Sequence, residues 1–254
     1  MRLTGNTILI TGGASGIGRG LAVAMHRAGN RVIIAGRRAD ALRAVADAHP
    51  GVEFLRLDVS DTAGIHRFVE GVQRDLPDLN VLVNNAGIMA VEDFAEPDPS
   101  ATSAVVNTNL LGPMVLTSLL LPTLRTHAHG AIINVTSALA FLPLAMAPTY
   151  SATKAGLHSY TEALRFQLRD NGIQVIEIAP PRVETEMDGP GDDGYTVTVD
   201  DFVAQVMAQL TAEPEAIEIV VEAARALRYA ERNGVYDQLF AAVNNSANPL
   251  EEIA

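Results

Sequence analysis

A tyrosine and a lysine four residues apart are the side chains in this sequence best suited to moving a proton. Tyr150 and Lys154 stand near the start of a stretch with helical character. Residues four apart share one face of a helix, so the ammonium group would lie beside the phenol. A phenol ionises with a pKa of about 10 on its own, and a neighbouring cation lowers that pKa towards neutrality. The pair therefore predicts general acid–base chemistry.

The composition makes this lysine unusual. Lys154 is the only lysine in the chain, whose 18 basic residues are otherwise all arginines. An arginine cannot readily replace a compact ammonium group in a crowded site. The alternative is a surface helix that carries an incidental tyrosine and lysine. The elements around the pair favour the chemical interpretation.

A glycine-rich turn near the N-terminus indicates where a dinucleotide would bind. Residues 7–10 form a short apolar run typical of a buried parallel strand, and an amphipathic helix follows the turn. Glycines let the backbone approach a pyrophosphate closely, and the start of the helix offers N–H groups and a positive dipole end. The spacing is G-x-x-x-G-x-G, and the candidate cofactor-binding residues are Gly12, Ser15, Gly16, Ile17 and Gly18.

Two arginines follow the second expected strand, at residues 31–35. Many NAD-binding folds place an acidic residue here, where it accepts a hydrogen bond from the ribose 2′-hydroxyl. Arg37 and Arg38 instead suit a 2′-phosphate, which guanidinium groups bind through charge-assisted hydrogen bonds. They predict NADP(H) as the cofactor in preference to NAD(H). The alternative is that both arginines only begin a solvated helix.

Strands and helices alternate along the rest of the chain. Further strands are expected at residues 52–57, 80–83, 130–136 and 173–178, and helices over residues 62–73, 101–125 and 149–169. This pattern predicts an α/β fold, a single-domain Rossmann-type, doubly wound, mostly parallel seven-stranded sheet with helices on both faces. Ligands bind beyond the carboxyl ends of such strands. The residues that follow strand ends are the glycine turn, Arg37, Asp58, Asn85, Ser137 and Pro180.

The pattern loosens after Pro181. Residues 184–193 are acidic and rich in glycine and proline, which is typical of a mobile loop, and we expect a substrate loop or lid over about residues 184–212. An edge strand is expected at residues 217–221. Helices are expected at 200–210, 222–232 and 235–243, before a flexible tail at 244–254. With no repeat or linker, residues 1–254 are predicted to form one domain.

The charge and composition exclude several classes of function. A net charge of −12 argues against nucleic acid and anionic membranes as partners, and against a strongly acidic carrier protein. The absence of cysteine excludes thiolate metal sites, and the six histidines lack a carboxylate cluster, so no metal is expected. The apolar runs look too short to span a bilayer and no cleavable signal is visible. A cytoplasmic protein is expected.

In their order along the chain, these motifs resemble the short-chain dehydrogenase/reductase family. The resemblance covers residues 6–185, and Ser137 lies thirteen residues before Tyr150, as in that family. Residues 137–146, 164–170 and 176–181 further resemble its DltE-type branch, whose substrate assignment is poor. The motifs are Thr11-Gly12-x3-Gly16-x-Gly18, Asp58, Asn84-Asn85-Ala86-Gly87, Asn109, Ser137 and Tyr150-x3-Lys154.

The resemblance implies a role for four catalytic residues. Tyr150 would exchange a proton with the substrate oxygen, and Ser137 would hydrogen-bond that oxygen. Lys154 would bind the ribose hydroxyls of the cofactor and lower the pKa of Tyr150. Asn109 would support a water that links Lys154 to solvent; Asn107 competes for this role, and the Asn-Leu-x-Gly context favours Asn109.

The resemblance also implies further cofactor contacts. Asp58 would accept from the adenine amine, unless it only caps the following helix. Pro181 departs from the family, which commonly has glycine there, and the C-terminus lacks the family's glycine-rich final strand. The remaining residues of the implied cofactor site are Val59, Asn85, Ala86, Gly87, Pro180, Val183 and Thr185.

The expected function is NADP(H)-dependent reduction of a carbonyl, or the reverse oxidation of an alcohol, on a small apolar substrate. The alternatives are a non-catalytic dinucleotide-binding regulator and an imine or enoyl reductase. The family's long helices pair into homodimers or homotetramers, for which exposed-looking residues such as Leu157, Tyr160 and Leu164 are candidates. The apolar residues that would outline the substrate pocket, or pack into the core or a subunit interface, are Met89, Phe141, Leu142, Leu144, Met146 and Met187.

Overall fold

The computed structural model describes residues 1–187 and 196–245, and its centre is a parallel sheet of seven strands. The spatial order is β3-β2-β1-β4-β5-β6-β7, so the strand order reverses between β1 and β4. This confirms the predicted fold class. The strands are β1 (Thr7–Thr11), β2 (Arg31–Gly36), β3 (Val52–Arg56), β4 (Val81–Asn84), β5 (Gly130–Val135), β6 (Ile173–Ile178) and β7 (Glu218–Ile219).

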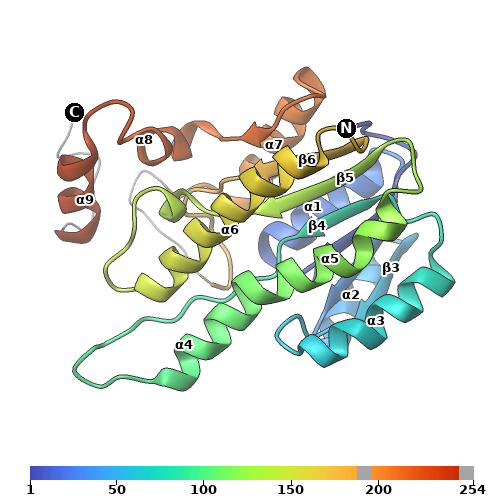
Figure 1. Cartoon of the computed structure of the whole chain (residues 1–254), viewed down its shortest axis with the longest axis horizontal. Helices are drawn as coiled ribbons and strands as arrows, with labels where there is room; N and C mark the ends of the chain where they lie inside the picture. Colours follow the sequence, from blue (N-terminus) through green and yellow to red (C-terminus); the bar gives the residue numbers. More distant parts are fainter. Residues whose placement is uncertain (188–195, 246–254) are drawn as a thin grey trace.

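Helices cover both faces of the sheet (Figure 1). One face carries α1 (Gly16–Arg27), α2 (Ala39–Ala48) and α7 (Val199–Ala212). The other carries α3 (Thr62–Asp75), α5 (Gly112–Leu124) and α6 (Pro148–Leu168), which lie in front of the sheet in Figure 1. The remaining described helices are α4 (Pro99–Val106), α8 (Arg225–Arg228) and α9 (Tyr236–Asn245).

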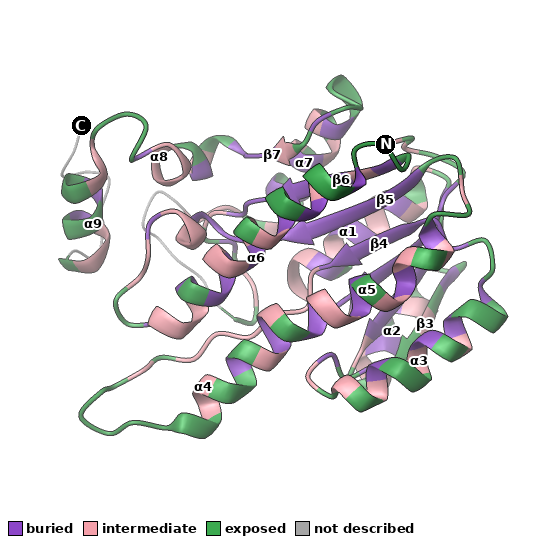
Figure 2. Cartoon of the chain, in the orientation of Figure 1, coloured by how far each residue is buried: buried purple, intermediate pink, exposed green. Residues whose placement is uncertain are grey.

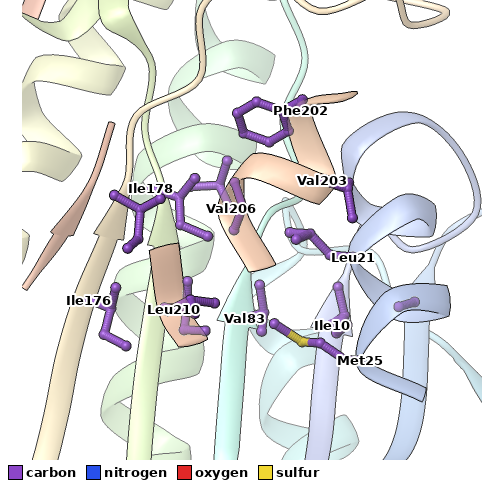
Figure 3. Packing of buried hydrophobic residues seen from close by; sticks show 14 of the residues in the cluster. Ile10, Leu21, Met25, Val83, Ile176, Ile178, Phe202, Val203, Val206 and Leu210 are labelled. Atoms are coloured by element: carbon purple, nitrogen blue, oxygen red, sulfur yellow. The ribbon is translucent and has the colours of Figure 1, made fainter. Parts of the chain in front are cut away.

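Alternating side chains of the strands form two cores, one on each face. Ile8 and Ile10 of β1 belong to the first core and Leu9 to the second, as the two-residue period of a strand requires. The central strands are buried along their length, as Figure 2 shows. In Figure 3, Phe202 and Val206 of α7 lie over the sheet beside α1. Each such apolar side chain contributes about 1.5–3 kcal/mol through its burial.

The long helix expected at residues 101–125 has two notable features, an interruption and a long apolar stretch. A π-helical turn at Asn107–Leu111 interrupts it between α4 and α5. The whole run Pro99–Leu124 has 26 residues and a mean hydropathy of 1.5 in its most apolar window, which is enough to cross a membrane by length and composition. The expectation that no apolar run is long enough was therefore wrong. Leu116, Leu120 and Leu124 are fully buried in the second core, which accounts for much of this apolar character.

The C-terminal part departs further from the sequence prediction. The prediction of one helix over residues 222–232 was wrong in length. A 3₁₀ turn, Glu222–Ala224, leads into α8, which has four residues, and turns follow it. Residues 199–212 of the expected substrate loop form α7, whose inner face is buried in the first core. Residues 188–195 of that loop, and most of the tail expected at 244–254, lie outside the described residues.

Two residues expected at a subunit surface lie instead inside this chain. Leu157 is 1% exposed and Leu164 is 7% exposed, and Leu164 packs in the second core. Tyr160 is partly buried against the same core. Helix periodicity alone could not reveal this, because α6 packs on the sheet along one side and on α4 along another.

Candidate functional site

A cleft opens at the carboxyl edge of the sheet, next to the reversal of strand order between β1 and β4. This edge is where parallel sheets of this type bind ligands. The lining brings together every predicted site residue except Asn109. It consists of Gly12, Ser15, Gly16, Ile17, Gly18, Arg37, Arg38, Asp58, Val59, Asn85, Ala86, Gly87, Ser137, Tyr150, Lys154, Pro180, Val183 and Thr185, with eleven further residues.

The glycine turn between β1 and α1 is packed so closely that side chains do not fit. Gly12 has a φ of +70°, which L-residues rarely adopt. A Cβ atom at Gly18 would lie 2.3 Å from the carbonyl oxygen of Gly12. Ser15 stands at the N-cap of α1 and makes no side-chain capping bond. The turn and the first residues of α1 thus present backbone to the cleft, in a form that suits a pyrophosphate.

Hydrogen bonds tie the end of β4 to the end of β1. The hydroxyl of Thr11 accepts hydrogen bonds from the backbone N–H groups of Asn85 (3.0 Å) and Ala86 (3.1 Å). The amide of Asn85 donates to the carbonyl of Thr11 at 2.9 Å. These bonds hold the segment that leads to Ala86 and Gly87, which line the cleft beyond the carboxyl end of β4.

The two arginines line the same cleft, and Arg38 reaches the glycine turn. Arg38 donates to Glu186 (3.0 Å) and to the hydroxyl of Ser15 (3.0 Å). Both members of the Arg38–Glu186 ion pair are more than half exposed. Any anion that binds Arg38 therefore competes with the carboxylate of Glu186, which was not among the predicted site residues. The signal was present in the acidic stretch that starts at Glu184, but the pairing joins residues 148 positions apart.

Asp58 follows β3 and lines the same cleft. Partial burial opposes its ionisation, but hydrogen bonds from Ser60 and the charges of Arg37 and Arg56 outweigh burial and lower the pKa of Asp58. The alternative interpretation, that Asp58 caps the next helix, is wrong. Asp61 occupies the N-cap of α3 and accepts from the N–H of Gly64 at 2.9 Å.

Tyr150 and Lys154 lie in the first two turns of α6, which starts with proline at Pro148. The helix brings the two side chains together on one face, as expected: the Lys154 ammonium lies 5.6 Å from the centre of the Tyr150 ring. Lys154 is 3% exposed and donates to the carbonyl of Val135 at 2.9 Å. Burial lowers the pKa of Lys154 to about 8. The cleft therefore contains a buried cation next to a phenol, an arrangement suited to proton transfer.

Ser137 follows the end of β5 and begins a 3₁₀ turn, Ala138–Ala140. Its hydroxyl accepts from the N–H of Leu139 at 3.1 Å, and a hydroxyl that accepts one bond can still donate its own hydrogen. The N–H of Ala138 donates to the carbonyl of Pro180 at 2.8 Å, which joins this turn to the end of β6. Ser137 and Tyr150 thus come from different elements and line one cleft.

Asn109 lies behind the cleft, in the π-helical turn, and is 1% exposed. Its amide accepts from the N–H of Ile88 (2.9 Å) and donates to the carbonyl of Ile88 (2.8 Å) and to the hydroxyl of Thr153 (3.2 Å). It therefore links the loop after β4 to α6, beside Lys154. Asn107, the competing candidate, is only partly buried.

The apolar residues expected to outline a substrate pocket divide into two groups. Leu142 is fully buried in a small core with Leu239 of α9, and Phe141 packs against the first core, so the packing alternative holds for both. Met187 lines the cleft, and Met146, just before α6, is half exposed. The other two candidates, Met89 and Leu144, are partly buried. Among the lining residues that sequence reasoning missed are Thr108 and Thr136, which are neighbours of predicted residues.

The chain matches known proteins over most of its length. The family model described as short chain dehydrogenase matches residues 6–196. The uncharacterized oxidoreductase DltE of Bacillus subtilis (strain 168) is 38% identical over 255 residues, which cover 98% of this chain and 100% of that protein.

Two solved structures with bound nucleotide have the same fold. A short chain dehydrogenase from Burkholderia cenocepacia in complex with NADP has a TM-score of 0.79 and 27% sequence identity, and the match covers 94% of this chain and 99% of that one. A 3-ketoacyl-(acyl-carrier-protein) reductase from Brucella melitensis complexed with NADH has a TM-score of 0.77 and 26% identity, and the match covers 86% of this chain and 98% of that one.

Proposed function

Because this chain belongs to the short-chain dehydrogenase family and is thus an oxidoreductase, we propose that it reduces a carbonyl group with NADPH, or oxidises the corresponding alcohol with NADP⁺. The observation that carries the proposal is the convergence of Ser137, Tyr150 and Lys154 on the same cleft that the glycine turn lines. The substrate we propose is small and apolar, because Met187 lines the cleft and Met146, shortly before Tyr150 in the chain, is a half-exposed apolar side chain.

The cleft residues fit a dinucleotide. The glycine turn, where added Cβ atoms would clash with Ala86 and with the Gly12 carbonyl, would hold the pyrophosphate on its backbone, and Asp58 and Val59 would contact the adenine. Lys154 would bind the ribose hydroxyls, with Pro180, Val183 and Thr185 near the nicotinamide. The cofactor supplies or accepts the hydride when it is bound.

The chain's own residues handle the proton and the oxygen. Tyr150 donates its phenolic proton to the substrate oxygen as that oxygen gains charge, and takes it back in the reverse direction. Lys154 stabilises the resulting phenolate through its charge. Ser137 donates a hydrogen bond to the same oxygen and stabilises the developing negative charge. Asn109 holds the loop at Ile88 and the helix at Thr153, and so keeps both sides of Lys154 in place.

The preference for NADP(H) rests on Arg37 and Arg38, at the place where NAD-binding folds commonly carry an acid. The two related structures contain NADP in one case and NADH in the other, so family membership leaves the choice open. The first experiment is titration with NADPH and then NADH, following the fluorescence of the reduced nicotinamide; the chain has no tryptophan to interfere. Tight NADPH binding with weak NADH binding is expected. Equal affinities would contradict the assignment to the arginines.

Turnover is tested by oxidation of NADPH with a panel of aliphatic and aromatic ketones, and with imines and enones for comparison. We expect turnover of ketones. Turnover of imines or enones alone would favour those chemistries on the same scaffold. Tight cofactor binding without turnover of any of the three classes would favour the non-catalytic, regulatory alternative.

A further inference from the structure

A buried carboxylate bonds to Thr136, the residue before Ser137, and lies outside the set of residues discussed above. Glu177 belongs to β6 and is 1% exposed. Its Oε2 lies 2.8 Å from Nδ1 of His158, and its Oε1 accepts a hydrogen bond from the hydroxyl of Thr136 at 2.6 Å. A buried carboxylate is costly unless it is paired and hydrogen-bonded. Thr136, Glu177 and His158 therefore form one connected polar group.

His158 stands on α6 one turn after Lys154, on the same face of the helix. The hydrogen bond that His158 donates to the Glu177 carboxylate raises the pKa of His158. Partial burial opposes this shift, the charges of Glu177 and Glu162 add to it, and the charge of Arg228 opposes it. Glu162 lies on α6 itself, 3.7 Å from Nε2, and Arg228 comes from α8. The imidazole thus keeps its proton to a higher pH than an isolated histidine does.

This polar group contacts the serine segment on both sides of Ser137. Thr136 immediately precedes Ser137 and lines the cleft. Its backbone N–H donates to the carbonyl of Ile178, which fixes Thr136 beside β6. Phe141, four residues after Ser137, packs edge-on against the ring of His158 with 4.7 Å between ring centres. The guanidinium of Arg228 lies 4.0 Å from the centre of the same phenylalanine ring. The segment is therefore held before and after its reactive residue.

We propose that His158 and Glu177 are positioning residues for Ser137. Their charged pair fixes Thr136 and Phe141, and thereby sets the direction in which the Ser137 hydroxyl points. The consequence for catalysis rests on the proposed role of Ser137 at the substrate oxygen. When His158 loses its proton, Glu177 loses the cation that it pairs with. As the pH rises through the pKa of His158, the position of the Ser137 segment should therefore change and the turnover rate should fall with it.

The coupling is tested first without substrate. Protein labelled with ¹⁵N at serine and histidine is titrated with pH and followed by NMR, and the Ser137 amide is assigned by its loss in Ser137→Ala. We expect the Ser137 amide to shift with the same midpoint as the His158 ring. A Ser137 amide that does not respond at the His158 midpoint would overturn the proposal.

Three variants separate coupling from mere loss of structure. In Glu177→Gln, the titration midpoint of the His158 ring should fall towards the ordinary value for histidine. The chemical shift of the Ser137 amide should no longer change at that midpoint. In Thr136→Val, which removes the hydroxyl link and keeps the Phe141 contact, the pKa of His158 should stay raised while the shift of the Ser137 amide at the His158 midpoint becomes smaller. In the control Glu162→Gln, on the exposed side of His158, Ser137 should still follow the imidazole.

The kinetic arm uses NADPH with acetophenone, or with the ketone that the wild type reduces fastest. Glu177→Gln should lower kcat by roughly tenfold or more while KM changes by less than about threefold, because a misplaced donor acts mainly in the transition state. NADPH affinity should not change. A Glu177→Gln variant with wild-type kcat would contradict the proposal. If the wild type reduced no ketone while Ser137 still followed His158, the proposed reaction would fail and the coupling would be supported.

Discussion

At Lys154, burial and charge oppose each other. The side chain is 3% exposed, and burial lowers its pKa to about 8, yet at neutral pH most molecules still carry the charge. The carbonyl of Val135 is its hydrogen-bond acceptor in the described structure. A cation held in this way costs stability, but it lies where it can act on Tyr150 with little screening by solvent.

Replacing Tyr150 tests its role most directly. Tyr150→Phe removes the hydroxyl and keeps the ring beside Lys154. We expect turnover to fall by at least about a hundredfold, since a positioned acid–base group contributes that much or more. NADPH binding, measured by fluorescence titration, should stay close to wild type. A variant that retains most of the activity would refute the proton-transfer role.

The ionisation of Lys154 predicts how stability depends on pH. Its pKa is about 8 in the folded chain, against an ordinary value of 10.5. Between these two pH values the unfolded chain binds a proton that the folded chain has lost, so stability rises with pH. Below pH 8 both states carry the proton, and the cost of burying the charge is present in full.

Lys154→Met should remove this dependence. The free energy of unfolding of the wild type, relative to the variant, should rise by up to about 3 kcal/mol from pH 8 to 10.5. Urea denaturation at several pH values measures the difference. A difference that stays flat across this window would show that the lysine titrates normally.

Arg38 and Glu186 make a prediction about cofactor choice. Arg38→Ala should weaken NADPH binding by about ten- to a hundredfold, the range for a hydrogen bond to a charged group, and leave NADH binding nearly unchanged. Glu186→Gln should tighten NADPH binding, by about fivefold at most, because the competing ion pair is exposed and weak. Fluorescence titration with both cofactors checks both variants, and weaker NADPH binding in Glu186→Gln would contradict the competition.

At the scale of the elements, the π-helical turn between α4 and α5 decides where Asn109 points. The N–H of Gly112 bonds to the carbonyl of Asn107, five residues back, which widens the helix at this place. Gly112 also lies against the loop after β3: a Cβ there would be 2.2 Å from the carbonyl oxygen of Val59. The helix can approach Val59, a predicted adenine contact, only because residue 112 is glycine.

Gly112→Ala should therefore destabilise the protein by about 1–3 kcal/mol, the usual cost of overpacking. The matched control is Gly71→Ala in α3, where the nearest atom to a new Cβ would be the end of the Arg74 side chain at 3.9 Å. That variant should gain up to about 1 kcal/mol from helix propensity. Thermal unfolding compares the two. If Gly112→Ala left the stability unchanged, the helix would be able to shift away from Val59.

At the scale of the whole molecule, some apolar surface on the long helices is not buried by this chain. Phe166 of α6 is 68% exposed and Leu111 of the π-helical turn is 40% exposed. We propose that they contribute to a homodimer or homotetramer. Light scattering should give a mass that is a multiple of the chain mass, and Phe166→Glu should lower it. Phe94→Glu, in the equally exposed loop before α4, should not; a monomeric wild type would contradict the proposal.

The order of the elements could be predicted from the sequence because it depends on near neighbours. Apolar runs, glycine turns and helical periodicity located most of the described strands to within a few residues, and strand β6 at Ile173–Ile178 with its expected limits. The spacing of Tyr150 and Lys154 already implied a shared helix face. Since parallel strands end at one edge, the residues after those ends could be assigned to a single cleft from the sequence alone.

Local pattern could not predict contacts between distant segments. The link from Thr136 through Glu177 to His158, and the pair of Arg38 with Glu186, depend on which strands and loops become neighbours in space. The burial of Leu157 and Leu164 depends on the surfaces that α6 packs against. Sequence spacing determined which residues could share a site, whereas packing across the sheet decided their partners, exposure and ionisation, because these depend on atoms far away in the chain.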